Sequence, residues 1–204
     1  MTALREFAFD DLFKFNRILF DPLTEVYTIA FYASRVFEFP MLTEVAVAPN
    51  GQVTGFIMGS RVRNKQWGRN GKDSDKMGSH GHVNALSIDN DYRRLGVGTL
   101  LMESFRVKLE VKREWYIDLF VRCKNQKAIK LYELLGYTKY SLLRKYYDDD
   151  DGYEMRLPLS QDVDGICLKG RKKVIDGFHS AGRELVKVLR TLFVRLRDAI
   201  LNML

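Results

Sequence analysis

Apolar residues recur along this chain with the period of a helix in some segments and of a strand in others. Residues 10–16 begin with the acidic pair Asp10-Asp11, which can cap a helix, and continue with apolar spacing of three and four, which predicts a helix start. A second helix is predicted after residues 21–24, and it should end before Pro40. Residues 43–58 hold two strand-like runs around Pro49-Asn50-Gly51, a strong signal for a hairpin.

The second half of the chain alternates strand-like and helix-like segments. Strands are predicted at residues 82–88, 115–121, 138–145 and 153–159. One helix should follow the turn at 91–99, with an apolar face made by Leu100, Leu101, Phe105 and Leu109. Another is predicted over 126–135 and should end at Gly136. This order implies an α/β fold, a mixed sheet with helices on both faces.

One internal segment has neither period. Residues 61–79 are rich in Gly, Lys, Arg, Asp and Ser, and no apolar spacing supports packing there. We expect an exposed loop, and its basic residues leave contact with nucleic acid open as the alternative.

Length and charge narrow the class of protein. A chain of 204 residues suits one medium domain with or without an appendage, and 46% hydrophobic residues argue against wholesale disorder. The net charge of +7 first suggests nucleic acid. However, residues 163–204 contain nine basic and four acidic residues, a net of +5, which leaves +2 for residues 1–162. The main body is therefore nearly balanced, and the basic excess lies in the tail.

Cysteine usage and the absence of long apolar runs suggest a compartment. Cys123 and Cys167 form no CxxC pair, so neither a disulfide framework nor a metal site is expected. The N-terminus shows no signal-peptide stretch, and no run approaches the roughly 18 apolar residues that span a bilayer. We expect a cytoplasmic protein.

Candidate chemistry is concentrated at the turn after residues 82–88. Gly96 and Gly98 stand at the entrance to a helix, where successive backbone N–H groups and the helix N-terminus favour an anion. The spacing is neither that of a Walker loop nor that of a dinucleotide fingerprint. By themselves the two glycines could equally serve a purely structural helix start.

The wider pattern resembles the GNAT acetyltransferase superfamily. It comprises Arg93-x-x-Gly96-x-Gly98, then Asn125-x-x-Ala128-x-x-Leu131-Tyr132, then Leu135-Gly136-Tyr137. The resemblance implies a GNAT fold and acetyl-CoA as co-substrate, with no metal. It assigns cofactor binding to Leu86, Ile88, Arg93, Arg94, Leu95, Gly96, Val97, Gly98, Thr99, Asn125 and Tyr132. In it the strand around Leu86–Ile88 pairs with pantetheine, and the Tyr132 hydroxyl meets the departing thiolate. Considered alone, Asn125 could simply cap a helix and Tyr132 could be a core aromatic.

More specific segments resemble the catalytic subunits of NatB-type N-terminal acetyltransferases. They are residues 2–7, 10–13, 21–27, 80–83, 117–122, 125–126, 146–147 and 153–156. This resemblance implies acetyl transfer to nascent polypeptide N-termini beginning Met-Asp, Met-Glu, Met-Asn or Met-Gln, by direct attack in a ternary complex. It also implies a large helical-repeat auxiliary subunit. Association with the ribosome is a separate expectation. Another acceptor, lysine or a small amine, and a non-catalytic binding module are the alternatives.

An α-amine needs only a modest base. Its pKa of about 7.7–8.0, against about 10.4 for lysine, leaves roughly a fifth of it neutral near pH 7. His82 is the candidate base because a histidine is mostly neutral at that pH, and its position matches the family's active-site histidine. A satisfied structural histidine is the alternative, and His80 is the weaker candidate.

The resemblance also assigns the peptide entrance. Glu25 and Tyr27 match positions that line it, and Tyr146 and Tyr147 match positions on the opposing loop, with surface or core packing as the alternative for each. His82 would also contact the peptide. Asn84 stands near the expected pocket for the second substrate residue, where the family usually has threonine, so the peptide preference is expected to be affected.

We divide the chain into a GNAT domain, 1–160, and a basic extension, 161–204. Within the extension, apolar residues recur at alternating four and three spacing, at Leu185, Leu189, Leu192, Leu196, Ala199 and Met203. Basic residues lie outside that seam, which predicts a cationic amphipathic helix. Packing on a protein helix, attachment to a membrane surface and contact with ribosomal RNA remain open.

Overall fold

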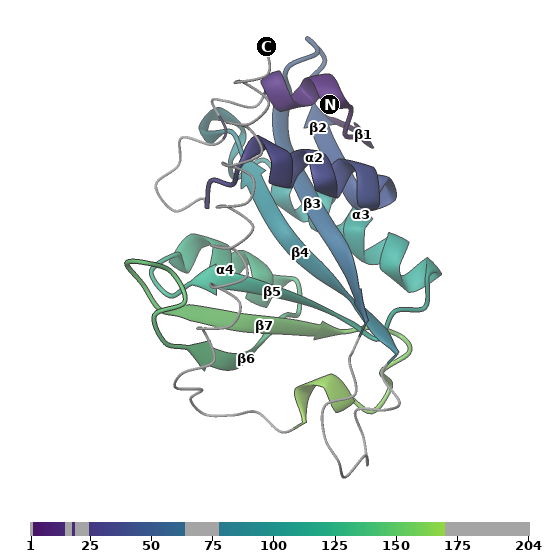
Figure 1. Cartoon of the computed structure of the whole chain (residues 1–204), viewed down its shortest axis with the longest axis vertical. Coiled ribbons are helices and arrows are strands. Elements are labelled where there is room, and N and C mark those ends of the chain that lie inside the picture. The colour runs from purple at the N-terminus through teal and green to yellow at the C-terminus, as the bar shows by residue number, and fades with distance from the viewer. Residues whose placement is uncertain (1, 15–17, 19–24, 64–77, 170–204) are drawn as a thin grey trace, which may run out of the picture.

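The computed structural model describes residues 2–14, 18, 25–63 and 78–169 (Figure 1). Its strands are β1 (Ala3–Glu6), β2 (Thr43–Val47), β3 (Val53–Arg63), β4 (Ser79–Ile88), β5 (Tyr116–Arg122), β6 (Thr138–Leu143) and β7 (Gly152–Pro158). Its α-helices are α2 (Ile29–Glu38), α3 (Val97–Val111) and α4 (Gln126–Leu134). Short 3₁₀ helices include η1 (Phe9–Phe13) and η5 (Ile166–Leu168).

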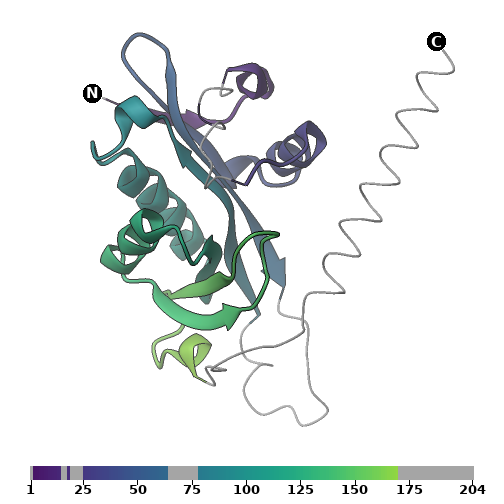
Figure 2. The ribbon, with the colours of Figure 1, turned by 90° about the vertical axis from the view of Figure 1, so that its left-hand side faces the viewer.

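The strands form one seven-stranded sheet in the order β1-β2-β3-β4-β5-β7-β6. Every neighbouring pair is antiparallel except β4 and β5, which are parallel. Helices α3 and α4 cover one face, and η1 and α2 cover the other (Figure 2). The predicted mixed sheet with helices on both faces is confirmed.

The parallel pair opens like a fork. Pairing between β4 and β5 extends only over Gly81–Val83 and Ile117–Leu119. On the other edge of β4, Val83 pairs with Gly59 and Ala85 with Met58, so Asn84 is the extra residue of a β-bulge. A bulge bends its strand, and this one lies where the pairing with β5 ends. The remainder of β4 therefore keeps a backbone edge that β5 does not cover.

The larger of two cores packs α3 and α4 against the sheet. Leu101, Phe105 and Leu109, spaced by four, are fully buried, and each contributes about 1.5–3 kcal/mol by burial. Gly81 lets α3 approach closely, because the Leu109 side chain occupies the space that a Cβ would need. The expected burial of Leu100 is wrong. It is 41% exposed, because one residue of helical rotation turns it away from the Leu101 seam.

The N-terminal prediction needs correction. The start at residue 10 is a short 3₁₀ helix, η1, and residues 15–17 lie outside the described part. Helix α2 begins only at Ile29, where Thr28 accepts a hydrogen bond from Phe31 N at 3.3 Å and caps it. Residues 25–28 are therefore not helical, and two of them, Glu25 and Tyr27, line the cleft described below. Strand β1 carries no clear alternation and was not predicted.

The remaining boundaries are close to those predicted. The hairpin of β2 and β3, the strands β4 to β7 and the helices α3 and α4 are confirmed, and Gly136 follows α4 with φ +90°. Strands β3 and β4 extend to Arg63 and from Ser79, so the loop predicted over 61–79 is shorter at both ends. Residues 64–77 lie outside the described part.

Residues just beyond the predicted domain boundary also pack on the sheet. Cys167 in η5 is buried, and its carbonyl accepts a hydrogen bond from Arg156 Nη1 at 2.8 Å. The Asp162 carboxylate accepts from the Ile166 and Cys167 amides at 2.6 and 2.9 Å. The boundary at residue 160 stays a prediction, and the amphipathic helix lies outside the described residues. Among the residues described, no helix is long and apolar enough to cross a membrane.

Candidate active site

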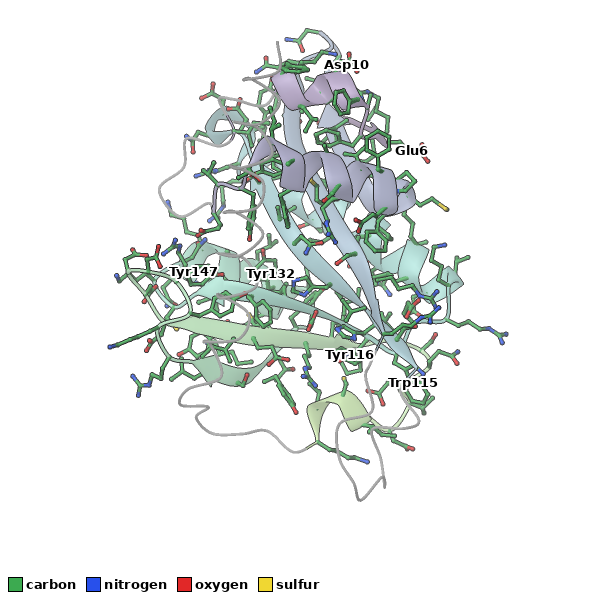
Figure 3. All side chains as sticks on the ribbon, viewed as in Figure 1. Glu6, Asp10, Trp115, Tyr116, Tyr132 and Tyr147 are labelled. Carbon is green, nitrogen blue, oxygen red and sulfur yellow. The ribbon has the colours of Figure 1, made fainter. Side chains whose placement is uncertain are left out.

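A cleft of about 100 Å³ lies in the fork between β4 and β5. Its walls are Val83–Leu86 of β4 and Leu119–Arg122 of β5, with Asn125, Ala128 and Tyr132 from the α4 segment. Glu25, Tyr27 and Tyr147 complete it (Figure 3 labels Tyr132 and Tyr147). The fork thus joins several residues that were predicted separately from the sequence.

The glycine turn lies beyond the end of β4. Gly96 is the N-cap of α3 with φ +81°, and a Cβ built there would meet no atom within 4 Å. The first helical hydrogen bond runs from Leu100 N to Gly96 O, at 2.9 Å, so the amides of Val97, Gly98 and Thr99 precede it. Backbone amides at a helix start, with open space beside Gly96, suit a phosphate or pyrophosphate.

Arg93 and Arg94 differ in what they do at this turn. Arg93 Nε donates to the Ile88 carbonyl at 3.1 Å, which ties the end of β4 to the turn. Arg94 is exposed and has φ +64°, a left-handed conformation, and Leu95 is exposed beside it. Leu86 lines the cleft, whereas Ile88 lies at the strand end near Gly98. An uncovered strand edge leading to an open helix N-terminus fits an elongated ligand such as acetyl-CoA.

Asn125 and Tyr132 combine both of the roles considered for them. Asn125 Oδ1 accepts from Ala128 N at 3.1 Å, so it caps α4, and the residue also lines the cleft. Tyr132 is buried in the larger core and reaches the cleft from α4. Burial raises the pKa of the Tyr132 phenol to about 12. The hydroxyl therefore keeps its proton at neutral pH and can donate it.

His82 forms a pair with a buried aspartate. His82 on β4 stands in register with Asp118 on β5, and its Nδ1 lies 2.7 Å from Asp118 Oδ1. The other carboxylate oxygen is 3.5 Å from His80 Nε2. Burial alone would raise the pKa of Asp118, but the two histidines more than offset it and hold that pKa well below the usual range. The carboxylate is therefore ionised, and His82 Nδ1 is its donor.

Charged and aromatic side chains surround the other end of the cleft. Arg122 Nη2 pairs with Glu25 Oε2 at 2.8 Å, and Nη1 pairs closely with Asp149. The guanidinium also lies over the Tyr147 ring, 4.3 Å from its centroid. Burial raises the pKa of the Tyr27 and Tyr147 phenols well above their ordinary value, so both hydroxyls stay protonated. Arg122 of β5 therefore links the segment of Glu25 to the loop that holds Tyr147 and Asp149.

Asn84 and Tyr146 lie between the two ends. Asn84, the bulge residue, lines the cleft, and its Oδ1 is buried without a hydrogen-bond partner among the described residues. Tyr146 is outside the cleft lining, but its ring lies 4.9 Å from both the Phe120 and the Tyr147 rings. Phe120 in turn contacts His82, with ring centroids 5.2 Å apart. An aromatic path thus leads from the entrance to the His82–Asp118 pair.

Comparison with protein families decides the class of this site. The acetyltransferase (GNAT) family matches residues 5–137, which include the fork, the glycine turn and α4. The chain belongs to the GNAT acetyltransferase family. A curated relative, the N-terminal acetyltransferase B complex catalytic subunit NAA20 of Arabidopsis thaliana, is 35% identical to this GNAT chain over 167 residues. The match covers 80% of this chain and 89% of the relative.

Solved GNAT structures agree with the fold. Chaetomium thermophilum Naa20 in complex with a bisubstrate analogue superposes with a TM-score of 0.77 at 32% identity, covering 85% of this chain and 96% of that one. A NatB acetyltransferase complex bound to CoA and MES gives a TM-score of 0.66 at 32% identity, covering 77% and 99%. Among the residues described here, no cluster of three or more His, Cys, Asp or Glu side chains could hold a metal ion.

Two residues of this GNAT site were missed as candidates from the sequence: Arg122, which lines the cleft, and Asp118, which pairs with His82. A signal was available, because strand alternation places them with Tyr116 and Phe120 on one face of β5. What the sequence could not supply was the register that sets Asp118 beside His82. Nor could it supply the approach of Glu25 and Asp149 to Arg122 from distant segments.

Proposed function

We propose that this chain is a NatB-like N-terminal acetyltransferase, which transfers acetyl from acetyl-CoA to the α-amine of chains beginning Met-Asp, Met-Glu, Met-Asn or Met-Gln. The observation that carries the proposal is the fork between β4 and β5. The uncovered edge of β4 leads to the glycine turn at the start of α3, the His82–Asp118 pair stands where the fork closes, and Glu25, Tyr27 and Tyr147 line the cleft mouth. The relative named NAA20, 35% identical over most of both chains, supports the NatB assignment.

The cofactor end would hold acetyl-CoA mainly through the backbone. The amides of Val97, Gly98 and Thr99 would donate to the pyrophosphate, and the uncovered edge of β4 around Leu86 would pair with the pantetheine amides. Arg93, by holding the Ile88 carbonyl, would fix the angle between strand and turn. Acetyl-CoA supplies the acetyl group as a reactive thioester. Asn125 supports this end by fixing the start of α4, which carries Tyr132.

The two proton-transfer roles fall to His82 and Tyr132. With Nδ1 donating to Asp118, His82 Nε2 carries the lone pair that accepts a proton from the α-amine, directly or through water. The Tyr132 hydroxyl keeps its proton at neutral pH and would give it to the departing sulfur. Neither cysteine is suited to act as a nucleophile, because burial raises the thiol pKa of both Cys123 and Cys167. Direct attack by the amine fits these residues.

The peptide end would hold the substrate backbone and the initiating Met. Glu25, Tyr27 and Tyr147 line the cleft mouth, and Tyr146 supports Tyr147 by ring contact. Asn84 lines the cleft and would contact the second residue of the substrate; its buried Oδ1 has no hydrogen-bond partner among the residues that the structure describes.

A partner subunit belongs to the proposal, because the similar structures include a NatB acetyltransferase complex. The surface beside η1 and α2 suits a partner: Phe9, Phe13 and Phe37 are 53%, 67% and 77% exposed. The Phe9 and Phe37 rings lie 6.2 Å apart, so they form one apolar patch. A cytoplasmic location, ribosome association and the role of the tail stay predictions.

An acetylation assay over a panel of Met-X peptides tests the proposal. We expect turnover on Met-Asp, Met-Glu, Met-Asn and Met-Gln peptides with free N-termini, increased by an auxiliary subunit, and none on the same peptides with blocked N-termini. Activity on blocked peptides that contain lysine would instead indicate a lysine acetyltransferase. Acetyl-CoA binding without turnover on any peptide, with the auxiliary subunit present, would indicate a binding module.

The base assignment has its own test in His82→Ala. Loss of a general base should lower kcat by about 100-fold or more, with acetyl-CoA binding unchanged, since His82 lies away from the glycine turn. Unchanged turnover would remove His82 from the mechanism and leave the acceptor assignment intact.

A further inference from the structure

The strongest feature outside the assigned site residues is the carboxylate of Asp118. Its side chain is 9% exposed, and it lies between two histidines of β4, with Oδ1 2.7 Å from His82 Nδ1 and Oδ2 3.5 Å from His80 Nε2. A buried carboxylate that only stabilised the fold could accept its hydrogen bonds from any donor. Here one of its partners is the proposed base.

Position in the sheet makes this pairing rigid. His82 and Asp118 are directly opposed in the short parallel segment of β4 and β5, one register position before the pairing ends at Val83 and Leu119. The pair therefore stands at the closed end of the fork. Asp118 also has β7 on its other side, where it is opposed to Arg156. Strands on both sides fix the carboxylate, so the imidazole it holds is fixed as well.

We propose that Asp118 is a positioning residue, which holds His82 as the tautomer with Nδ1–H toward the carboxylate and the Nε2 lone pair free for the amine, while His80 anchors the second carboxylate oxygen. The proposal rests on the proposed base role of His82. As the nitrogen–carbon bond forms, the amine proton passes to Nε2. The carbon–sulfur bond breaks with its electron pair going to the sulfur, which takes the proton of the Tyr132 hydroxyl. His82 becomes imidazolium, and Asp118 stays a carboxylate that stabilises it. His82 Nε2 has no hydrogen-bond partner among the described residues, which suits this role.

The other ionisable groups near the His82–Asp118 pair are either neutral near pH 7 or paired with each other. Tyr116 stacks on His80 at 4.4 Å, and Arg156 lies over Tyr116 at 5.0 Å and pairs with Glu154. Burial raises the pKa of Tyr116 and Tyr137, so both stay neutral near pH 7. Arg156 and Glu154 satisfy each other. The charge that responds to protonation of His82 is therefore that of Asp118.

The test compares Asp118→Asn, His82→Ala and the double variant in the acetylation assay. Asp118→Asn should lower kcat about 10- to 100-fold with the peptide and acetyl-CoA KM within about twofold. The acidic limb of its pH–rate profile should move to lower pH, because a neutral amide no longer stabilises the imidazolium. In the His82→Ala background, Asp118→Asn should cause no further loss. Independent, multiplicative losses in the double variant would overturn the proposal.

A matched control separates positioning from folding. Asp162 is also a buried aspartate, but it serves the η5 turn outside the cleft. Asp162→Asn should lower thermal stability and leave kcat and the pH profile unchanged. Asp118→Glu, which keeps the charge, should recover part of the activity lost in Asp118→Asn.

Nitrogen NMR of the histidine rings tests the proposal without activity. In the unmodified protein, His82 should show a protonated Nδ1 and an unprotonated Nε2 above the pH at which the ring titrates, with Nδ1–H shifted downfield by the carboxylate. The opposite tautomer would overturn the proposal even if Asp118→Asn failed to fold. A correct tautomer in a chain without acetyltransferase activity would uphold the pairing and reject the proposed function instead.

Discussion

The cofactor end of the site is formed mainly by backbone groups, and the peptide end mainly by side chains. The cofactor end is mostly backbone: the uncovered edge of β4 and the amides that begin α3. The peptide end is made of side chains from segments far apart in the sequence, Glu25, Arg122, Tyr147 and Asp149. A backbone site tolerates changes in its side chains but not in its glycine, whereas a side-chain site can be altered one contact at a time. Substrate preference can therefore diverge while the donor stays the same.

The largest effect is expected from Gly96→Val. A β-branched side chain at φ +81° is strained, and its methyl groups would fill the open space beside Gly96, which directly precedes the first α3 amide. Losing one or two hydrogen bonds to a charged phosphate should raise the acetyl-CoA KM about 10- to 100-fold. Steady-state kinetics with acetyl-CoA varied at saturating peptide measure this.

Gly51 supplies the control, because it has φ +82° and equally open surroundings in the turn between β2 and β3. Gly51→Val and Gly96→Val should each lower the free energy of unfolding by roughly 1–2 kcal/mol, because both place a β-branched residue at positive φ. Gly51→Val should leave the acetyl-CoA KM unchanged. Equal effects of both variants on KM would mean that Gly96 acts through stability alone.

This contrast also explains what the sequence revealed and what it did not. The spacing of Gly96 and Gly98 before an amphipathic helix is local, so it could be identified without a structure. The bulge at Asn84 depends on the pairing of β4 with β3, and the register of His82 with Asp118 joins residues 36 positions apart, so no local pattern encodes either. Local propensity likewise misplaced the start of α2, because the Thr28 cap and packing of residues 25–28 at the cleft overrode it.

The second effect concerns acid stability, and it tests whether Asp118 is ionised at the closed end of the cleft. A folded-state pKa below the unfolded value contributes stability that is present above about pH 4 and is lost as pH falls through the folded value. We expect this contribution to be about 2 kcal/mol. The difference in unfolding free energy between the unmodified protein and Asp118→Asn should shrink progressively as pH falls below about 4, as measured by urea unfolding. A difference independent of pH would mean that Asp118 is not ionised as proposed.

A smaller effect is expected at the entrance. Arg122→Met keeps the aliphatic stem but removes the links to Glu25 and Asp149. The peptide KM should rise about three- to tenfold because the entrance loses its fixed geometry, while the acetyl-CoA KM should stay constant. Arg144→Met is the matched control, since Arg144 pairs with Asp151 near the same loop but does not line the cleft. A comparable change in both variants would point to a general charge effect.

The smallest and most specific effect should come from Asn84→Asp. The substitution keeps the shape of the side chain and replaces the carboxamide, whose Oδ1 is buried without a hydrogen-bond partner in the described part of the chain, by a carboxylate. If this group contacts the second substrate residue, the introduced carboxylate repels the carboxylate of a substrate Asp. It still accepts a hydrogen bond from the side-chain amide of a substrate Asn. Relative kcat/KM for Met-Asn over Met-Asp peptides should therefore rise about two- to fivefold, as measured in direct competition. Asn84→Thr, which withdraws the oxygen, should change the same ratio in the opposite direction. A ratio unaffected by either variant would place the second substrate residue elsewhere, and would show that the bulge shapes the fork without reading the peptide.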